Sequence, residues 1–343
     1  MKTIVEIPKT MNVLNLHEVG DLRLEKKETY TLTKNHVLVK IKYCGICSSD
    51  IERIFFNGTY NFPTIPGHEM SGQIVAVNDE DEKLLGKKTA IFPLIPCFKC
   101  TACKKEEYAQ CANYNYFGSR CDGGYSEYLL VPKWNLVLFD DKLDYKIAAL
   151  CEPGAVAIHS VNIGKITSGD SVAISGTGTI GMMIALVAKE KGANVTVIGR
   201  SKSSLEFSNR IGLNTLLNSD IENKTYDKVF EVVGNNESIN QSIRLANDFG
   251  TVILVGNPKN NVELDKQIYW KILRKQINLK GIWNSSYNSK INDWKEILDL
   301  MSKGEIPFES LISKVYPMSK FENAFEYLKD SSEKKLKVMF KNE

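Results

Sequence analysis

The stretch "SVAISGTGTIGMMIALVAKEKG", residues 171–192, decides how the middle of the chain folds. It reads as a short apolar strand, a glycine-rich turn and an amphipathic helix. Its glycines have G-x-G-x-x-G spacing, in which the first permits a tight turn, the second lets the backbone approach a pyrophosphate, and the third lets the helix pack closely on the strand. A helix N-terminus also attracts phosphate. We therefore predict a dinucleotide site, against the alternative of a tight turn with no ligand. The predicted contacts are Gly176, Thr177, Gly178, Thr179, Ile180 and Gly181.

The alternation of strand and helix continues over residues from about 151 to 290, as in "NVTVIG", "KVFEVVG" and "GTVILVG". Short apolar strands separated by amphipathic helices are typical of a parallel sheet covered on both faces. Residues 1–150 are instead rich in strands and turns. Residues 291–343 are expected to be helical with a closing strand and to pack back on the first region. The predicted fold class is α/β plus β, in two domains.

Bulk composition is that of an ordinary soluble protein. The 343 residues carry a formal net charge of +3, with 43% hydrophobic and 25% charged residues. This charge is too small to indicate a nucleic-acid or membrane partner, and no uncharged apolar run reaches the ~18 residues that a membrane helix needs. Residues 1–10 contain no apolar signal core. We therefore expect a cytoplasmic protein whose thiols stay reduced.

The end of the strand at 194–199 bears on which dinucleotide is bound. An NAD site usually carries Asp or Glu about 20 residues beyond the first glycine, where it accepts a hydrogen bond from the ribose 2′-hydroxyl. This chain has no acid there and has Arg200, Ser201 and Lys202 instead. An arginine fork and a serine hydroxyl can bind a 2′-phosphate, which a carboxylate would repel. The sequence therefore predicts NADP(H) in preference to NAD(H). The alternative is that these residues are solvated loop charges.

Half of the eight cysteines lie in "CFKCTACKKEEYAQC", residues 97–111. Four thiolates on one short loop can surround a zinc ion as a tetrahedron, and an iron–sulfur cluster is the metal alternative. A disulfide is disfavoured in a reducing compartment, and a redox C-x-x-C pair would not need four cysteines. We predict a structural zinc site, closed to substrate because no coordination position is left open. Its ligands are Cys97, Cys100, Cys103 and Cys111.

A second group of metal-ligand residue types is spread over "KYCGICSSDIERI", "IPGHEMSGQIV" and "ALCEPGAVAIHS". One cysteine, one histidine and one or two carboxylates suit zinc, and three protein ligands with a position left for water or substrate are typical of a catalytic site. Each residue also has a purely structural interpretation, and spacing alone does not decide between the two. The candidates are Cys47, Ser49, Asp50, His68, Glu69 and Glu152.

With these motifs in place, the chain resembles the zinc-containing medium-chain alcohol and polyol dehydrogenases. The matching stretches cover nearly the whole chain in the family's order: "GICSSD", "GHEMSG", the four-cysteine lobe, "DGGYSEYLLVP", "CEPGAVAIHS", "GTGTIG" and "VILVGNP". The resemblance implies a GroES-like catalytic domain with the structural zinc lobe over residues 1–150 and a Rossmann domain over 151–290. It also implies that residues 291–343 return to the catalytic domain.

The family pattern assigns roles to the second group of residues. By resemblance, Cys47 and His68 are ligands of a catalytic zinc ion, and the third ligand is either Glu69 or Glu152. Glu152 stands where alcohol-type members place a cysteine and polyol-type members a glutamate, which points to the polyol branch.

By the same resemblance, Ser49 relays the substrate proton and Asp50 orients His68. Zinc would lower the pKa of a substrate hydroxyl while hydride passes to the nicotinamide. Val255 and Gly256 in "VILVGNP" are expected to contact the cofactor. The cofactors expected are therefore two zinc ions per chain, one catalytic and one structural, and NADP(H).

Residues 269–287 resemble the galactitol-1-phosphate 5-dehydrogenase branch, close to sorbitol and L-iditol dehydrogenases. The expected substrate is a polyol or ketose, free or phosphorylated, although members of that branch usually carry an acid where this chain has "GRSK". Arg120 and Arg274 are phosphate-binding candidates by charge alone, and the alternative for each is an exposed surface ion pair. A sorbitol- or threonine-type dehydrogenase with the same zinc chemistry is an alternative. A non-catalytic NADPH-binding protein is an alternative of another class.

The resemblance also bears on assembly. Family members are usually dimers or tetramers, often joined through the edge strand that matches "NLKGIW", residues 278–283. We therefore expect a homodimer or homotetramer.

Overall fold

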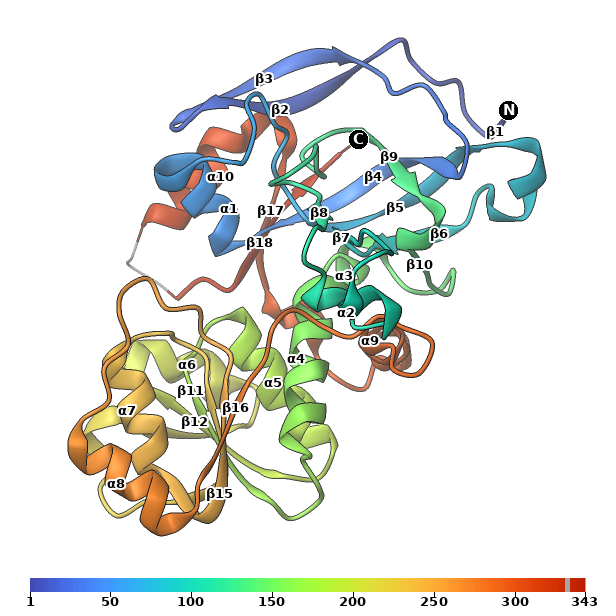
Figure 1. The fold of residues 1–343 in the computed structure, drawn as a ribbon. Helices are drawn as coiled ribbons and strands as arrows, with labels where there is room; N and C mark the ends of the chain where they lie inside the picture. Colours follow the sequence, from blue (N-terminus) through green and yellow to red (C-terminus); the bar gives the residue numbers. More distant parts are fainter. Residues whose placement is uncertain (331–333, 343) are drawn as a thin grey trace. The chain divides into compact units, whose positions relative to one another are not determined.

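Figure 1 shows the fold as a computed structural model, which describes residues 1–330 and 334–342. These residues form two compact units. The first unit comprises Met1–Glu152, Ser286–Asp330 and the residues from Lys337 onward. The second unit comprises Pro153–Ser285 and residues 334–336.

The first unit is built on a sheet of eight strands. Its central strand is β4 (His36–Ile46), which pairs antiparallel with β5 (Glu69–Val77), β9 (Tyr128–Pro132) and β18 (Lys337–Lys341). The last strand of the chain therefore lies beside one of the first. The other strands are β1 (Lys2–Thr3), β6 (Lys88–Ile91), β10 (Leu136–Leu138) and β17 (Ile312–Pro317).

Smaller elements complete the first unit. Two antiparallel pairs lie outside the large sheet: β2 (Thr10–Glu18) with β3 (Asp21–Glu28), and β7 (Leu94–Ile95) with β8 (Asn115–Tyr116). The helices are α1 (Ser48–Glu52), α2 (Thr101–Lys104), α3 (Tyr145–Ala148), α9 (Asp293–Lys303) and α10 (Phe321–Lys329). A π-helical turn, Arg53–Asn57, follows α1 directly.

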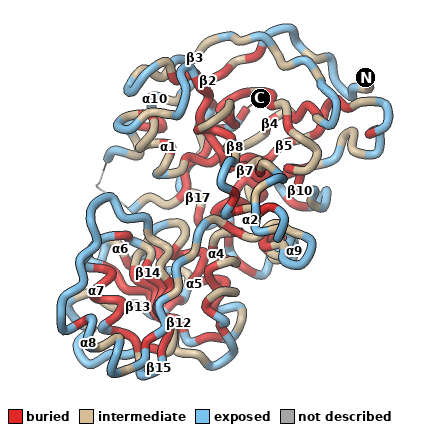
Figure 2. Tube along the Cα trace, in the orientation of Figure 1, coloured by how far each residue is buried: buried red, intermediate tan, exposed pale blue. Residues whose placement is uncertain are grey.

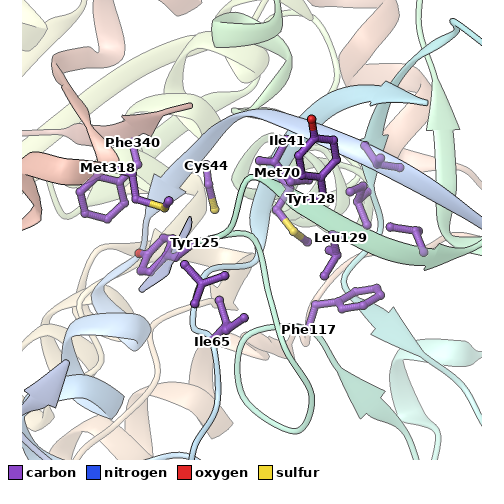
Figure 3. Packing of buried hydrophobic residues seen from close by; sticks show 14 of the residues in the cluster. Ile41, Cys44, Ile65, Met70, Phe117, Tyr125, Tyr128, Leu129, Met318 and Phe340 are labelled. Carbon is purple, nitrogen blue, oxygen red and sulfur yellow. The ribbon is translucent and has the colours of Figure 1, made fainter. Parts of the chain in front are cut away.

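The core of the first unit forms where apolar residues of the strands meet. Figure 2 shows buried residues concentrated along the strands, as expected where alternate side chains turn inward. Figure 3 shows Tyr125, Phe340 and Cys44 within this core. The rings of Tyr125 and Phe340 meet edge to face, with centroids 4.9 Å apart. This packing attaches β18, at the end of the chain, to the centre of the unit.

The second unit is a six-stranded parallel sheet with the order β13-β12-β11-β14-β15-β16. Its strands are nearly continuous apolar runs because helices cover both faces of such a sheet. The strands are β11 (Ser171–Ser175), β12 (Asn194–Gly199), β13 (Asn214–Leu217), β14 (Tyr226–Glu231), β15 (Ala246–Leu254) and β16 (Asn278–Gly281). The helices are α4 (Cys151–Gly164), α5 (Thr179–Glu190), α6 (Lys202–Arg210), α7 (Asn236–Arg244) and α8 (Lys266–Lys275), of which α4 begins in the first unit.

This strand order is that of the Rossmann fold, so the fold class predicted from the sequence is confirmed. The order reverses between β11 and β14, and in open parallel sheets ligands bind beyond the carboxyl ends of the strands at such a point. In the described residues, no helix is both long enough and apolar enough to cross a bilayer.

Candidate active site and metal centres

The first group of candidate residues begins where β4 ends. Cys47 is the extended N-cap residue of α1, so Cys47 and Ser49 lie at the start of that helix. The Ser49 hydroxyl donates to Cys47 Sγ at 3.3 Å. Asp50, one residue further, is completely buried. A tight strand-to-helix junction therefore places a thiol, a hydroxyl and a buried acid within four residues.

Asp50 fixes the orientation of His68. Its Oδ1 lies 3.0 Å from His68 Nδ1, and it also accepts from the backbone N–H of Cys47, from Arg53 and from the Tyr125 hydroxyl. Burial alone would lower the pKa of His68, but the Asp50 carboxylate outweighs it and raises that pKa well above its ordinary value. Because Nδ1 is engaged, Nε2 is the nitrogen available to a metal.

Glu69 opens β5 and is paired with Gly45 of β4. Its Oε1 accepts a hydrogen bond from Lys337 Nζ at 2.6 Å, and the two side chains are only 1% and 5% exposed. Its Oε2 is buried without a hydrogen-bond partner. A Cβ at position 45 would lie 2.0 Å from that oxygen, so glycine there makes room for the carboxylate. A buried carboxylate oxygen without a donor can bind a cation.

Cys47, His68 and Glu69 each offer one ligand atom, and these atoms lie within 4.8 Å of one another. A thiolate, an imidazole and a carboxylate are a donor set that suits zinc and leaves a fourth position open. Together with the unpartnered Glu69 oxygen, this donor set fits the metal that the sequence predicts.

Glu152 lies outside that set of three. It is buried at the start of α4 and accepts a hydrogen bond from the Tyr116 hydroxyl at 3.3 Å. Burial raises its pKa to about 7, with His68 opposing this effect and Glu69 adding to it. Tyr116 in turn lies against His68, with ring centroids 5.7 Å apart. Glu152 is therefore a neighbour of the three-residue set within the same unit.

Ser49 has a second contact that the sequence did not indicate. Arg53 Nη1 donates to Ser49 Oγ at 3.0 Å and to Asp50 Oδ1 at 3.2 Å. Since Ser49 also donates to Cys47, its hydroxyl lies between a cation and a thiol. Ser49 is only partly buried, so the hydroxyl is in a position to exchange a proton with solvent.

The four cysteines around α2 form a second centre. All four are free thiols whose ligand atoms lie within 4.8 Å of one another. Cys97 and Cys103 have their sulfurs 4.0 Å apart, and Cys100 and Cys111 have theirs 3.9 Å apart. A disulfide needs ~2.05 Å, whereas a tetrahedron with Zn–S bonds of ~2.3 Å separates its sulfurs by about 3.8 Å. The N–H groups of Cys103 and Ala112 lower the pKa of Cys100 to about 6, which favours the thiolate.

The glycine-rich turn lies between β11 and α5 in the second unit. Gly176 has φ +127°, a conformation that other residues rarely adopt, and a Cβ at Gly181 would lie 2.3 Å from the Gly176 carbonyl oxygen. A Cβ at Gly178, the N-cap of α5, would meet nothing within 4 Å. Two of the glycines are therefore needed by the fold, and the third faces open space. Thr177, Thr179 and Ile180 complete the turn and the first residues of α5.

Arg200, Ser201 and Lys202 follow β12 and are exposed. The Gly176 N–H donates to the Ile198 carbonyl of β12 at 3.3 Å, which ties the glycine turn to the strand that carries these residues. Ser201 is also the N-cap of α6, where its hydroxyl accepts from the N–H of Ser204 at 3.2 Å. Helix capping therefore occupies one acceptor position of the serine that the sequence predicted to bind phosphate.

Val255 and Gly256 follow β15, where both backbone N–H groups donate to the Glu231 carbonyl at 2.9 and 3.0 Å. The fully buried Glu231 side chain accepts from the N–H groups of Val233 and Gly234. A Cβ at Gly256 would lie 2.7 Å from Glu231 Oε2 and 2.2 Å from Gly234 N. Beside these residues is a cavity of about 490 Å³, lined by residues 233–237 and 257–262.

The sequence did not point to Lys337, Tyr116 or Arg53. Lys337 reaches its partner Glu69 across 268 residues of sequence, so no local pattern marks it. Arg53 lies in the stretch that was quoted for Cys47, Ser49 and Asp50, whereas Tyr116 lies outside all of the quoted stretches. Lys337 and Arg53 could be linked to the metal site only after the structure had shown that the predicted ligands lie close together.

Two family models match this chain. Residues 33–141 match the alcohol dehydrogenase GroES-like domain, and residues 179–303 match the zinc-binding dehydrogenase model. The first match contains the Cys47–His68–Glu69 set and the four-cysteine lobe, and the second begins inside the glycine turn.

Among curated proteins, galactitol 1-phosphate 5-dehydrogenase of Escherichia coli strain K12 is 32% identical over 294 residues, which cover 82% of this chain and 85% of that protein. L-galactonate-5-dehydrogenase of the same strain is 31% identical over 330 residues, covering 92% and 95% of the two chains. Among solved structures, galactitol-1-phosphate dehydrogenase from Escherichia coli superposes with a TM-score of 0.89 at 29% identity, covering 96% of this chain and 99% of that one.

We predict that Cys103→Ser removes one zinc ion per chain and leaves the other, because three thiolates and a hydroxyl hold zinc less well than four thiolates. Metal analysis of the purified protein measures this directly. Cys121→Ser is the matched control, since Cys121 belongs to neither candidate centre. Retention of both zinc ions by the Cys103 variant would contradict the lobe assignment.

We predict that Asp50→Asn weakens zinc binding at the other centre by about 10- to 100-fold, the usual effect of losing the partner that orients a histidine ligand. Competition with a chelator measures the affinity, with the four-cysteine zinc as an internal reference. Asp81→Asn serves as the control, because Asp81 is a buried acid paired with Lys133 away from the ligands. Equal zinc affinity in both variants would show that Asp50 does not act through His68.

Proposed function

The chain belongs to the zinc-containing medium-chain alcohol and polyol dehydrogenases, and from this we propose that it transfers hydride between NADP(H) and a sugar alcohol or sugar-alcohol phosphate. As a member of this family it is a zinc- and NAD(P)-dependent oxidoreductase. The observation that carries the proposal is the convergence of Cys47, His68 and Glu69. A non-catalytic nucleotide-binding protein would have no need of an open metal site beside a hydroxyl relay.

We assign different steps of alcohol oxidation to different residues of the first unit. A zinc ion held by Cys47, His68 and Glu69 would act as a Lewis acid on the substrate hydroxyl, and the nicotinamide would exchange hydride. We assign to Ser49 the role of accepting the substrate proton, and this is supported by the contact of its hydroxyl with Cys47 and by its partial exposure. Arg53 donates to the same hydroxyl oxygen and so stabilises negative charge on the relay.

Glu69 is our choice for the third zinc ligand. It supplies an unpartnered oxygen within the three-residue set, whereas Glu152 lies outside that set and is bonded to Tyr116. We therefore assign Glu152 to substrate binding, because its carboxyl group can form a hydrogen bond with a second hydroxyl of a polyol. A monoalcohol has no second hydroxyl, so this role favours a polyol.

Two observations support a polyol as substrate. The relatives named above are by name galactitol-1-phosphate and galactonate dehydrogenases, and Glu152 matches the polyol branch of the family. A sorbitol-type enzyme acting on the free polyol is the second candidate, favoured by the same Glu152. The two candidates differ in whether the substrate carries a phosphate group.

The preference for NADP(H) is supported by Arg200 and Lys202 at the carboxyl end of β12, with no acid between Gly199 and Lys202. Eight free thiols suit a reducing compartment such as the cytoplasm. For assembly, β16 is an edge strand with Leu279 40% exposed and Trp283, shortly after it, 55% exposed. These features favour a homodimer or homotetramer joined through that edge.

The proposed function predicts turnover in a screen of galactitol, sorbitol, their phosphates and the matching ketoses with NADP(H) and NAD(H).

His68→Ala should lower turnover at least about a hundredfold, because Lewis-acid stabilisation is worth several kcal/mol and each ~1.4 kcal/mol is tenfold in rate. NADPH binding, followed by its fluorescence, should be retained. His36→Ala is the control, since His36 is a partly exposed residue at the start of β4. Full turnover by the His68 variant would refute the catalytic assignment.

The cofactor assignment predicts that Arg200→Glu lowers kcat/KM for NADP(H) by about ten- to a hundredfold and leaves that for NAD(H) unchanged or raised, since a carboxylate repels the 2′-phosphate. Steady-state kinetics with both cofactors measure this. Arg210→Glu, which makes the same charge change at the end of α6, should leave the ratio unchanged. A wild-type enzyme that prefers NAD(H) would overturn the assignment.

A further inference from the structure

Arg120 has an unusual setting for a surface arginine. Its guanidinium carbon lies over two tyrosine rings, 4.1 Å from the centroid of Tyr60 and 4.4 Å from that of Tyr114. Contacts of a cation with the faces of aromatic rings fix its plane and are strongest where water is partly excluded, and Arg120 is partly buried. The side chain is therefore held in place without the use of its N–H groups.

Those N–H groups are not neutralised by an acid. Across residues 1–330 and 334–342, no carboxylate forms an ion pair with Arg120. The acid closest in sequence, Asp122, is taken by Lys27 at 2.6 Å and by Tyr30 at 2.8 Å. A positioned guanidinium with its donor edge unpaired matches the geometry of a phosphate, which it can bind through two parallel hydrogen bonds.

The backbone around Arg120 is tied to the loop that carries Tyr60. Tyr60 N–H donates to the Ser119 carbonyl at 3.1 Å, the Asn61 side chain donates to the Arg120 carbonyl at 3.4 Å, and Arg120 N–H donates to the Tyr116 carbonyl at 2.9 Å. Both segments belong to the first unit. The position of Arg120 is thus built into that unit.

The same turn leads to the candidate metal centre. Tyr116 lies against His68 with ring centroids 5.7 Å apart, and Tyr114 lies against Tyr116 at 6.3 Å. Tyr116 also donates to Glu152. Two tyrosines therefore separate Arg120 from a metal ligand, and the cation lies at one end of a short aromatic path whose other end is the reacting centre.

We propose that Arg120 binds the phosphate of a sugar-alcohol phosphate whose reacting hydroxyl occupies the Cys47–His68–Glu69 centre, and that it makes the enzyme selective for phosphorylated substrates. This inference rests on the proposed function and adds to it the substrate class. The other arginine singled out by charge does not have this setting: Arg274 is exposed on α8 of the second unit and, among the described residues, lies over a single ring, that of Trp270 at 5.0 Å.

The test compares galactitol 1-phosphate with galactitol, and sorbitol 6-phosphate with sorbitol, on the zinc-loaded enzyme. In Arg120→Met, kcat/KM for the phosphorylated polyol, divided by kcat/KM for the free polyol, should fall by about ten- to a hundredfold. This is the loss expected for a charged hydrogen-bonding group. The fall should come from a higher KM for the phosphorylated substrate. Arg120→Lys, which keeps the charge but not the fork, should fall between. Arg274→Met removes an equal charge and should leave the ratio unchanged.

The outcomes separate this inference from the proposed function. If wild type oxidises free polyols and Arg120→Met changes both substrates equally, the inference fails and the dehydrogenase assignment stands. If wild type oxidises none of the four compounds, the proposed function fails, and calorimetric binding of the two phosphates decides about Arg120. Binding that weakens at least tenfold in Arg120→Met supports the inference, and no phosphate-dependent binding to wild type overturns it.

Discussion

The buried carboxylate of Asp50 is the interaction on which the rest of the first unit's chemistry depends. It accepts hydrogen bonds from a backbone N–H, an arginine, a tyrosine and His68, so a charge that would be costly alone is satisfied from several directions. Because these donors come from the junction of β4 and α1, the π-helical turn, the residue before β5 and the segment before β9, the carboxylate joins separate parts of the chain at one point. The orientation of the His68 imidazole, and with it the direction in which Nε2 would meet the proposed metal, follows from that junction.

A second buried charge pair has a related role. Lys337 and Glu69 are almost fully buried, and such a pair seldom stabilises a fold more than apolar residues would. The pair suits a Glu69 that remains ionised at the proposed metal centre, because the lysine compensates the charge while Glu69 Oε2 stays free. Lys337 is the first residue of β18, so the pairing of the last strand with β4 also delivers this cation to the site. Fold and site are thus coupled through one strand.

Features of the fold and the site could be predicted from the sequence where the residues that form them lie close together in the chain. The alternation of strands and helices and the glycine turn predicted the fold class, and the four lobe cysteines span only fifteen residues, so their spacing already groups them. Cys47 and His68 are far enough apart that spacing left them open, and only the family pattern joined them. Lys337 could not be predicted, because its partner depends on strand order rather than on neighbours in sequence. Arg120 was visible as a charge, but its aromatic setting required the packing of two distant loops.

The central claim is that one thiolate, one imidazole and one carboxylate hold a zinc ion at the open site, apart from the four-cysteine lobe. The most direct test is a crystal structure with anomalous diffraction data collected on both sides of the zinc absorption edge. The account predicts two zinc peaks per chain, one surrounded by four sulfurs and one between Cys47 Sγ, His68 Nε2 and a Glu69 oxygen. A single peak at the lobe, with Cys47 and His68 facing apart, would contradict it.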